Sequence, residues 1–352
     1  MNKSQVLSIP FSRQSGFALS RLVALLVAVL LFSASVPAQA ITLKIATLAP
    51  DGTSWMREMR AAAKQVKEDT AGRVTLRFYP GGVMGNDKSM LRKIRVGQLH
   101  GCTLTGGGLA SVYPDSQVYS LPFLFRSFAE VDYVRQRMDP LFLQGMEDKG
   151  FISFGLSEAG FAYLMSQSPL NQVDDLRQQK VWAPEGDKIS RRAFEALDVS
   201  PIPLPLTDVL TGLQTGLINT VGTSPVGAIA LQWHTKIKYL ADAPLLYLYG
   251  TLIIKKNIFS RLSDVDQKIV KKILSGAFER INKQNREDNE GARLALQNQG
   301  ITFITPTEKN LMQWRQLLGK AVDDMGEAGF YSLDVMKQLR KHLEVFRSAQ
   351  TL

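Results

Sequence analysis

The sequence predicts an α/β protein of two lobes, each a β-sheet flanked by helices, with one long helix bridging both. Three observations carry this prediction. Strand and helix patterns alternate from residue 43 onward, and a similar series begins again after Gly150. A helical pattern without proline then runs over residues 264–299. Alternating strands and helices favour mainly parallel sheets with helices packed on their faces.

The first series opens with a short alternating strand at residues 43–47. Thr53 or Ser54 is suited to cap the helix that follows, because a hydroxyl oxygen can accept from the free backbone N–H groups of the first turn. A second strand is predicted over residues 73–79 and a second amphipathic helix over residues 89–96. Ligands of such sheets bind in the crevice beyond the carboxyl ends of the strands.

A glycine triplet, residues 106–108, ends the next predicted strand at residues 102–105. The triplet is either a backbone cradle for an anion or a turn that lets another segment approach closely. The absence of a following Gly-Lys-Ser/Thr pattern favours the turn. The apolar segment 121–125 is expected in the core, with a helix over residues 128–138 after it.

The second series contains shorter elements separated by turns. Strands are predicted at 151–156, 162–166, 180–183, 200–204 and 217–221, a turn at 174–175, and helices at 188–197 and 208–215. Residues 247–255 are apolar enough for a strand that crosses back between the lobes. The long helix has a polar stretch over residues 283–290, as expected of a solvent-spanning bridge. Two helices within residues 308–346 are expected to brace the second lobe.

The segments that cross between the lobes define the predicted domain boundaries. Residues 1–40 form an export signal. The first lobe comprises residues 41–159 plus 248–288, and the second comprises residues 160–247 plus 289–352. A chain of about 310 residues after the signal is long enough for two ordinary cores.

The export signal is predicted from three basic residues ahead of an apolar run at 22–32, followed by a small-residue exit at Ala38 and Ala40. The run is shorter than the roughly 20 residues that span a bilayer, so cleavage after Ala40 is favoured over a permanent anchor. The mature chain is then expected in the periplasm, where ATP and reduced nicotinamide cofactors are normally absent.

Composition excludes several other functions. Removing the three signal cations lowers the formal net charge from +10 to about +7, and no run of basic residues suggests nucleic-acid binding. Cys102 is the one cysteine and His100, His234 and His342 lie far apart, so we expect neither a disulfide nor a metal site. No Gly-x-Ser-x-Gly elbow or other catalytic motif is present, so we expect no enzyme activity and no cofactor.

Five motifs in a characteristic order resemble one family. They are Thr-Ala-Gly-Arg-Val at 70–74, Tyr-Pro-Gly-Gly-Val-Met-Gly at 79–85, Leu-Pro-Phe-Leu-Phe at 121–125, Asp-Leu at 175–176 and Leu-Gln-Thr-Gly at 213–216. Over residues 42–345 the chain resembles the DctP-like solute-binding proteins of TRAP (tripartite ATP-independent periplasmic) transporters. No single motif is specific to this family, so the resemblance rests on the order and spacing of all five.

The resemblance implies a monomeric receptor of the two-lobed periplasmic binding protein fold, without chemistry of its own. Such a receptor closes around a small solute and delivers it to a permease with a small and a large integral membrane subunit. Closure requires that the solute bind the closed form more tightly than the open form. The alternative is an orphan periplasmic sensor or envelope component that is not coupled to transport.

The chain departs from the family at three polar positions. Trp182 stands where relatives carry an arginine that holds a solute carboxylate, and Ala162 follows Gly160-Phe161 where many have a second arginine. The usual asparagine after the Leu-Gln-Thr-Gly motif is also missing from its place in segment 219–225. We therefore hypothesise a neutral or cationic solute, with a carboxylate held by other groups as the alternative.

Candidate ligand contacts follow from these departures. Trp182 is either a stacking platform for the solute or a filler of the core, and Glu158 and Glu185 are either cleft acids or solvated loop acids. Thr223 and Ser224 stand near the family asparagine position. The full set of candidate ligand-binding residues is Trp182, Glu185, Glu158, Phe161, Thr223, Ser224, Arg126, Trp55 and Asp51.

Overall fold

The computed structural model describes residues 40–350. The predicted export signal, residues 1–40, lies almost entirely outside the described residues. None of the helices in residues 40–350 combines the length and the apolar character needed to cross a membrane.

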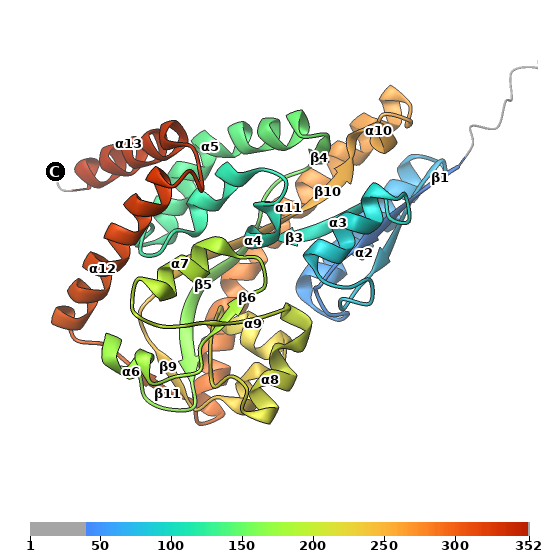
Figure 1. Ribbon diagram of the computed structural model, residues 1–352. Coiled ribbons are helices and arrows are strands. Elements are labelled where there is room, and N and C mark those ends of the chain that lie inside the picture. Colours follow the sequence, from blue (N-terminus) through green and yellow to red (C-terminus); the bar gives the residue numbers. More distant parts are fainter. Residues whose placement is uncertain (1–39, 351–352) are drawn as a thin grey trace, which may run out of the picture. The chain divides into compact units, whose positions relative to one another are not determined.

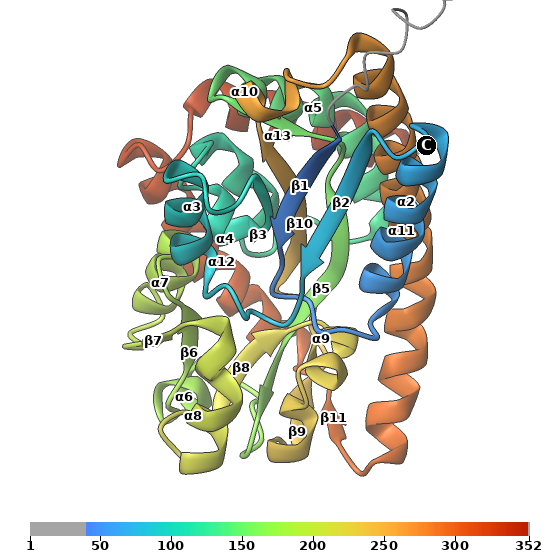
Figure 2. The ribbon, with the colours of Figure 1, turned by 90° about the vertical axis from the view of Figure 1, so that its right-hand side faces the viewer.

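Two long antiparallel strands at the centre of the fold, β5 and β10, connect its two halves (Figure 2). One end of β10 pairs with β3 and β4, whereas β5 also pairs with β8 and β9. Within residues 40–350 the sheet order is β11-β9-β5-β10-β3-β1-β2, with a separate pair β6-β7. The strands are β1 (Ile41–Ala46), β2 (Val74–Tyr79), β3 (Gly101–Thr105), β4 (Phe151–Ser153), β5 (Ser157–Ser166), β6 (Trp182–Pro184), β7 (Ile202–Leu204), β8 (Thr220–Thr223), β9 (Tyr239–Ala241), β10 (Leu246–Lys255) and β11 (Thr302–Ile304).

Helices cover both faces of this sheet (Figure 1). Thr53 caps the first of them, accepting from the backbone N–H of Met56 as predicted. The helices are α2 (Ser54–Asp69), α3 (Asp87–Arg95), α4 (Gly106–Leu109), α5 (Phe128–Asp148), α6 (Val173–Arg177), α7 (Lys188–Glu195), α8 (Val209–Thr215), α9 (Pro225–Ala230), α10 (Lys256–Phe259), α11 (Asp264–Asn298), α12 (Glu308–Glu327) and α13 (Leu333–Ala349).

Local predictions fail at three places. The turn expected at residues 174–175 is the short helix α6, because Asp175 accepts from the backbone N–H of Gln172 and caps it. Helix α5 continues ten residues beyond its predicted end, through Pro140. Strand β5 begins at Ser157 rather than Ala162, because pairing with β10 extends it.

Helix α11 bridges the two halves, as predicted. It packs against α2 on one half and against β5 and α9 further along (Figure 2). Helix α12 contacts α6 and α7 of the second half. Helix α13 packs instead against α5, so the expectation that both C-terminal helices brace the second lobe is wrong for α13 (Figure 1). The exact lobe boundaries stay a prediction.

Four hydrophobic clusters stabilise the described part of the fold. One joins α2, β1 and β2 to the first part of α11. A second lies between α3, α5, β3 and α13, and it also includes Ile189 of α7 and Met325 of α12. The third surrounds β6, α7 and α12, and the fourth surrounds α8, β8 and Trp233. The halves therefore meet through part of the second cluster as well as through β5, β10 and α11, and a cavity lies between them.

Candidate functional site

A cavity of about 890 Å³ is lined from both halves of the fold. Leu48, α3 and α4 contribute from the first half, and β6, α7 and the start of α9 contribute from the second. Small-molecule sites typically measure about 300–1,000 Å³ and are mostly apolar with a few convergent polar groups. The cavity has that size and position, at the crevice that the strand-helix pattern predicts.

Most of the cavity wall is apolar and aromatic. Trp182 and Trp233 lie on one side, and their rings meet edge to face with centroids 5.1 Å apart. The other large lining side chains are Phe194, Tyr249 and Trp314. Such a wall favours an apolar body or a ring in the ligand.

Trp182 both lines the cavity and belongs to the core. Its side chain is 4% exposed, and its indole Nε1 donates to the backbone oxygen of Leu204 at 3.0 Å. The N–H donor is therefore already used, which leaves the ring itself to contact a ligand. The two interpretations of Trp182 from the sequence are thus compatible with each other.

Two carboxyl groups from opposite halves meet the glycine triplet at the cavity. A side chain on Gly107 would lie 3.1 Å from Asp187, at the start of α7. A side chain on Gly108 would collide with Asp87, at the start of α3. The triplet forms α4 and allows the close approach that the second interpretation of it required, and two carboxyl groups beside it oppose anion binding there. We call Asp87 and Asp187 the acidic pair.

Both members of the acidic pair are hydrogen-bonded and half-buried. Thr105 Oγ1 donates to Asp87 Oδ2 at 2.7 Å, and Ser190 donates through N and Oγ to Asp187. Burial raises the pKa of Asp87 to about 6, and the Thr105 hydrogen bonds partly oppose this shift. Burial also raises the pKa of Asp187 above its usual range. Sequence reasoning missed both residues, although their positions just ahead of two amphipathic helices were a usable signal.

Basic groups reach the cavity from one helix face. Among the described lining residues they are Lys88, Arg92 and Arg95, all on α3 and all exposed. An exposed cation is hydrated and screened, so it holds a carboxylate less firmly than a buried arginine fork does.

Three predicted contacts besides Trp182 line the cavity. Glu185 is exposed, and its Oε2 accepts from Asn86 Nδ2 at 2.8 Å, which joins the two halves. Thr223 and Ser224 are buried in the wall. Ser224 Oγ caps α9 by accepting from the backbone N–H of Gly227 at 3.3 Å.

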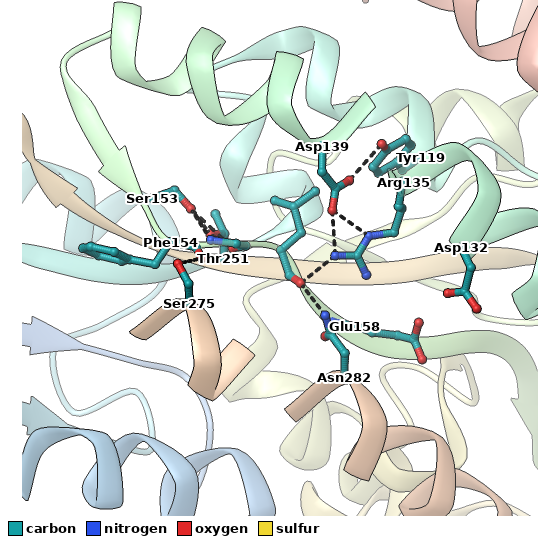
Figure 3. Close-up of polar contacts among 12 residues, drawn as sticks. Tyr119, Asp132, Arg135, Asp139, Ser153, Phe154, Glu158, Thr251, Ser275 and Asn282 are labelled. Atoms are coloured by element: carbon teal, nitrogen blue, oxygen red, sulfur yellow. Dashed lines mark hydrogen bonds and ion pairs between the residues drawn. The ribbon is translucent and has the colours of Figure 1, made fainter. Parts of the chain in front are cut away.

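Glu158 lies elsewhere, in a polar network between β5, β10 and α11. Arg286 Nε donates to Glu158 Oε1 at 2.9 Å and Tyr247 Oη donates to Oε2 at 3.0 Å. Arg135 in turn donates to Tyr247 Oη. Arg135 also donates to Asp139, as Figure 3 shows. Because Glu158 is buried in this network and absent from the cavity lining, it braces the connection between the halves.

The remaining predicted contacts also lie outside the cavity lining. Phe161 packs against Phe128 and Tyr247, and Trp55 meets Phe78 edge to face. Asp51 pairs with Arg60, and Arg126 is an exposed residue whose backbone N–H donates to Glu130. The structure thus brings together four of the nine predicted residues, which are Trp182, Glu185, Thr223 and Ser224.

Residues 40–350 hold no group of three or more histidine, cysteine or acidic side chains arranged to bind a metal ion. Cys102 is buried, and burial holds its pKa well above its usual range. A mostly apolar cavity between two halves that share connecting strands is the arrangement of a two-lobed binding protein.

Comparison with known proteins identifies the family. Residues 45–328 match the family described as DctP, bacterial extracellular solute-binding protein, family 7. The chain is 24% identical to the C4-dicarboxylate-binding periplasmic protein DctP of Rhodobacter capsulatus, over 73% of this chain and 78% of that one. It is 23% identical to the sialic acid-binding periplasmic protein SiaP of Vibrio cholerae, over 84% and 93% of the two chains.

Solved structures share the fold. The sugar acid binding protein DctPAm from Advenella mimigardefordensis, in complex with galactonate, has a TM-score of 0.81 at 17% identity, covering 87% of this chain and 98% of that one. A TRAP periplasmic solute-binding protein from Xanthobacter autotrophicus, with bound β-D-galacturonate, has a TM-score of 0.79 at 18% identity, covering 86% and 99%. The chain belongs to the DctP-like family of TRAP solute-binding proteins. It is a periplasmic receptor for small molecules and not an enzyme.

Proposed function

We propose that this receptor takes up its solute in the cavity between α3, α4, β6 and α7, closes around it and delivers it to a TRAP-type permease. The permease would consist of a small and a large integral membrane subunit. The chain would reach the periplasm through a signal cleaved after Ala40 and act as a monomer. The single observation that supports this proposal is an apolar cavity of about 890 Å³ lined from both halves.

Closure follows from contacts to both lobes, which we place at residues 41–159 plus 248–288 and residues 160–247 plus 289–327, with α13 packed on the first lobe. Asn86 of the first lobe already donates to Glu185 of the second. A solute that touches α3 and β6 together adds further contacts that exist only in the closed form. Such differential contacts are what shift a two-state equilibrium.

The solute is neutral or cationic. Trp182 fills the position of the arginine fork, the acidic pair lies in the cavity wall, and the lining cations are exposed. Relatives of this chain include proteins named for C4-dicarboxylate and for ectoine binding, so the family as a whole accommodates different solutes. The side chains of this cavity match the carboxylate class poorly.

Mass spectrometry of the small molecule that co-purifies with the protein from its periplasm tests the proposal. We expect one bound molecule per chain, without net negative charge, that raises the melting temperature of the emptied protein. Stabilisation by small dicarboxylates alone would contradict the assignment of solute charge. Absence of any bound or stabilising molecule would contradict the receptor function.

A further inference from the structure

Besides the hydrogen bond between α3 and the loop after β6, the two halves approach each other closely at two glycines. A Cβ on Gly82 would lie 2.7 Å from Thr207 Cγ2, and a Cβ on Gly107 would lie 3.1 Å from Asp187 Cβ. Both glycines belong to the first half, and both neighbours belong to the second. At these two points the halves come too close for a side chain to stand between them.

Gly107 is the more informative of the two glycines. It lies in the short helix α4, which packs on β3, β10 and residues 114–120. Alanine is favoured over glycine in a helix, so the local backbone gives no reason for glycine here. The three atoms nearest to a Cβ at Gly107 all belong to Asp187: Cβ at 3.1 Å, Cγ at 3.2 Å and Oδ2 at 3.3 Å. The second half therefore explains why this position carries no side chain.

The side chain of Asp187 is held in place at the start of α7. Its Oδ1 accepts from the backbone N–H of Ser190 at 3.0 Å, and its Oδ2 accepts from Ser190 Oγ at 2.7 Å. Two residues further on, Ile189 is 2% exposed and belongs to the hydrophobic cluster between α3, α5, β3 and α13. The start of α7 thus rests on the first half through a fixed carboxyl group and an apolar side chain.

Gly108 provides an internal comparison with Gly107. A side chain on Gly108 would collide with the carboxyl group of Asp87, which accepts from Thr105 Oγ1. Asp87 and Thr105 both belong to the first half. A side chain on Gly108 would therefore disturb the packing within that half, whereas one on Gly107 would disturb only the approach of the other half.

Resting on the closure proposed above, we infer that Gly107 and Asp187 form the contact at which α7 docks on α4 when the lobes close. Both residues line the cavity, so this contact sets how closely the cavity walls approach each other. Gly107 is a positioning residue, because it acts through the spacing of the lobes. A methyl group there overpacks a contact whose partner is fixed, which disfavours the closed form while each lobe stays folded.

Cross-linking of the closed form tests this inference on the mature protein without any solute. In the background Asn86→Cys/Glu185→Cys, a short bis-methanethiosulfonate reagent links the two thiols only while the halves are close, because the original side chains meet at 2.8 Å. Cys102 is buried and should not react. Adding Gly107→Ala to this background should slow cross-linking at least about 5-fold.

Gly291→Ala on α11 is the matched control in the same background. The position is exposed, and no other part of the described chain comes within 4 Å of a Cβ placed there, so cross-linking should proceed at the background rate. Asp187→Gly removes all three atoms nearest to Gly107, and glycine is tolerated at the start of a helix. Gly107→Ala together with Asp187→Gly should therefore cross-link as fast as Asp187→Gly does.

Melting temperatures separate closure from folding. Gly107→Ala should melt close to wild type, and Gly108→Ala should melt at a clearly lower temperature. The inference is overturned if Gly107→Ala cross-links at the background rate, if it melts as low as Gly108→Ala, or if Asp187→Gly does not restore cross-linking. Failure of the receptor function would appear separately, as a wild-type protein with no co-purified solute whose cross-linking still responds to Gly107→Ala.

Discussion

Asn86 Nδ2 and Glu185 Oε2 lie 2.8 Å apart and form a direct hydrogen bond between α3 and the loop after β6. Both residues line the cavity, and the bond pairs a charged acceptor with a neutral donor. It exists only while the two halves are close. It therefore contributes to the stability of the closed form and not to the folding of either half.

Glu185→Ala should shift the receptor toward its open form. Losing one hydrogen bond to a charged group at an exposed site costs about 0.5–1.5 kcal/mol, which corresponds to solute affinity about 2- to 10-fold weaker. Calorimetry with the co-purified solute and small-angle scattering of the solute-free protein measure the two effects. Glu287→Ala, an exposed acid on α11, is the control and should change neither. Unchanged affinity in Glu185→Ala would show that this bond does not affect closure.

Glu158→Ala should destabilise the whole protein. Glu158 is buried, and its removal leaves Arg286 and Tyr247 without their shared acceptor. Breaking a buried ion pair by removing one partner costs about 3–5 kcal/mol. Urea unfolding gives the free energy directly.

Asp132→Ala is the matched comparison for Glu158. Asp132 pairs with the same guanidinium but is 59% exposed, so its removal should cost less than about 1 kcal/mol. Equal losses in both variants would mean that burial does not determine how much each carboxylate contributes to stability.

Trp182→Phe should retain much of the packing against Trp233 but leave the backbone oxygen of Leu204 without its side-chain donor. We expect a loss of about 1–3 kcal/mol of stability. Trp182→Ala should cost about 3–5 kcal/mol, because a large buried ring is removed. Thermal unfolding of both variants measures these differences, and similar losses would indicate that the wall has collapsed around the smaller side chain.

Asp87 should make stability depend on pH. Its pKa is raised to about 6 by burial, so the folded state binds a proton more readily than the unfolded chain does. A group of this kind costs stability above its folded pKa, and that cost diminishes as pH falls through about 6 toward 4. Asp87→Asn should therefore be more stable than wild type at pH 8, by about 3 kcal/mol at most, and nearly equal to it at pH 4.

Chemical unfolding of wild type and Asp87→Asn across this pH range checks the prediction. Other carboxyl groups, such as Glu130 and Asp266, have lowered pKa values in the folded state. Their protonation at low pH destabilises both proteins alike. Only the difference in unfolding free energy between the two proteins is therefore informative. If the difference in unfolding free energy between the two proteins does not vary with pH, the pKa of Asp87 is not raised in the folded state.

Local pattern predicted most elements of the fold, because each of them is stable through a periodic apolar face of its own. Helix α11 and the β1-α2-β2 start are examples, and Thr53 was identified as a cap. The local pattern did not predict the full length of β5, which pairing with β10 extends. It also did not predict α6, a short helix stabilised by its capping residues.

The candidate site was only partly predictable, because its residues meet through tertiary packing and not through a local pattern. Trp182 stood out as a departure from the expected family pattern, and Glu185 stood out because it lies beside that departure. Asp87 and Asp187 stand just ahead of two predicted helices, but an acid there is also an ordinary capping residue, so this signal alone did not select them. Glu158, two residues before Gly160, is a candidate cleft acid from the sequence, but in the structure it forms an ion pair with Arg286.

The sequence by itself determined the α/β class, the bridging helix and the family, because these depend on local periodicity and on the order of short motifs. Tertiary structure alone decided which charges enter the cavity and which are neutralised within the fold. A carboxyl group acts as a ligand contact or as a structural brace according to the partner that folding places beside it. That partner lies 18 residues away for Asp87 and 128 residues away for Glu158.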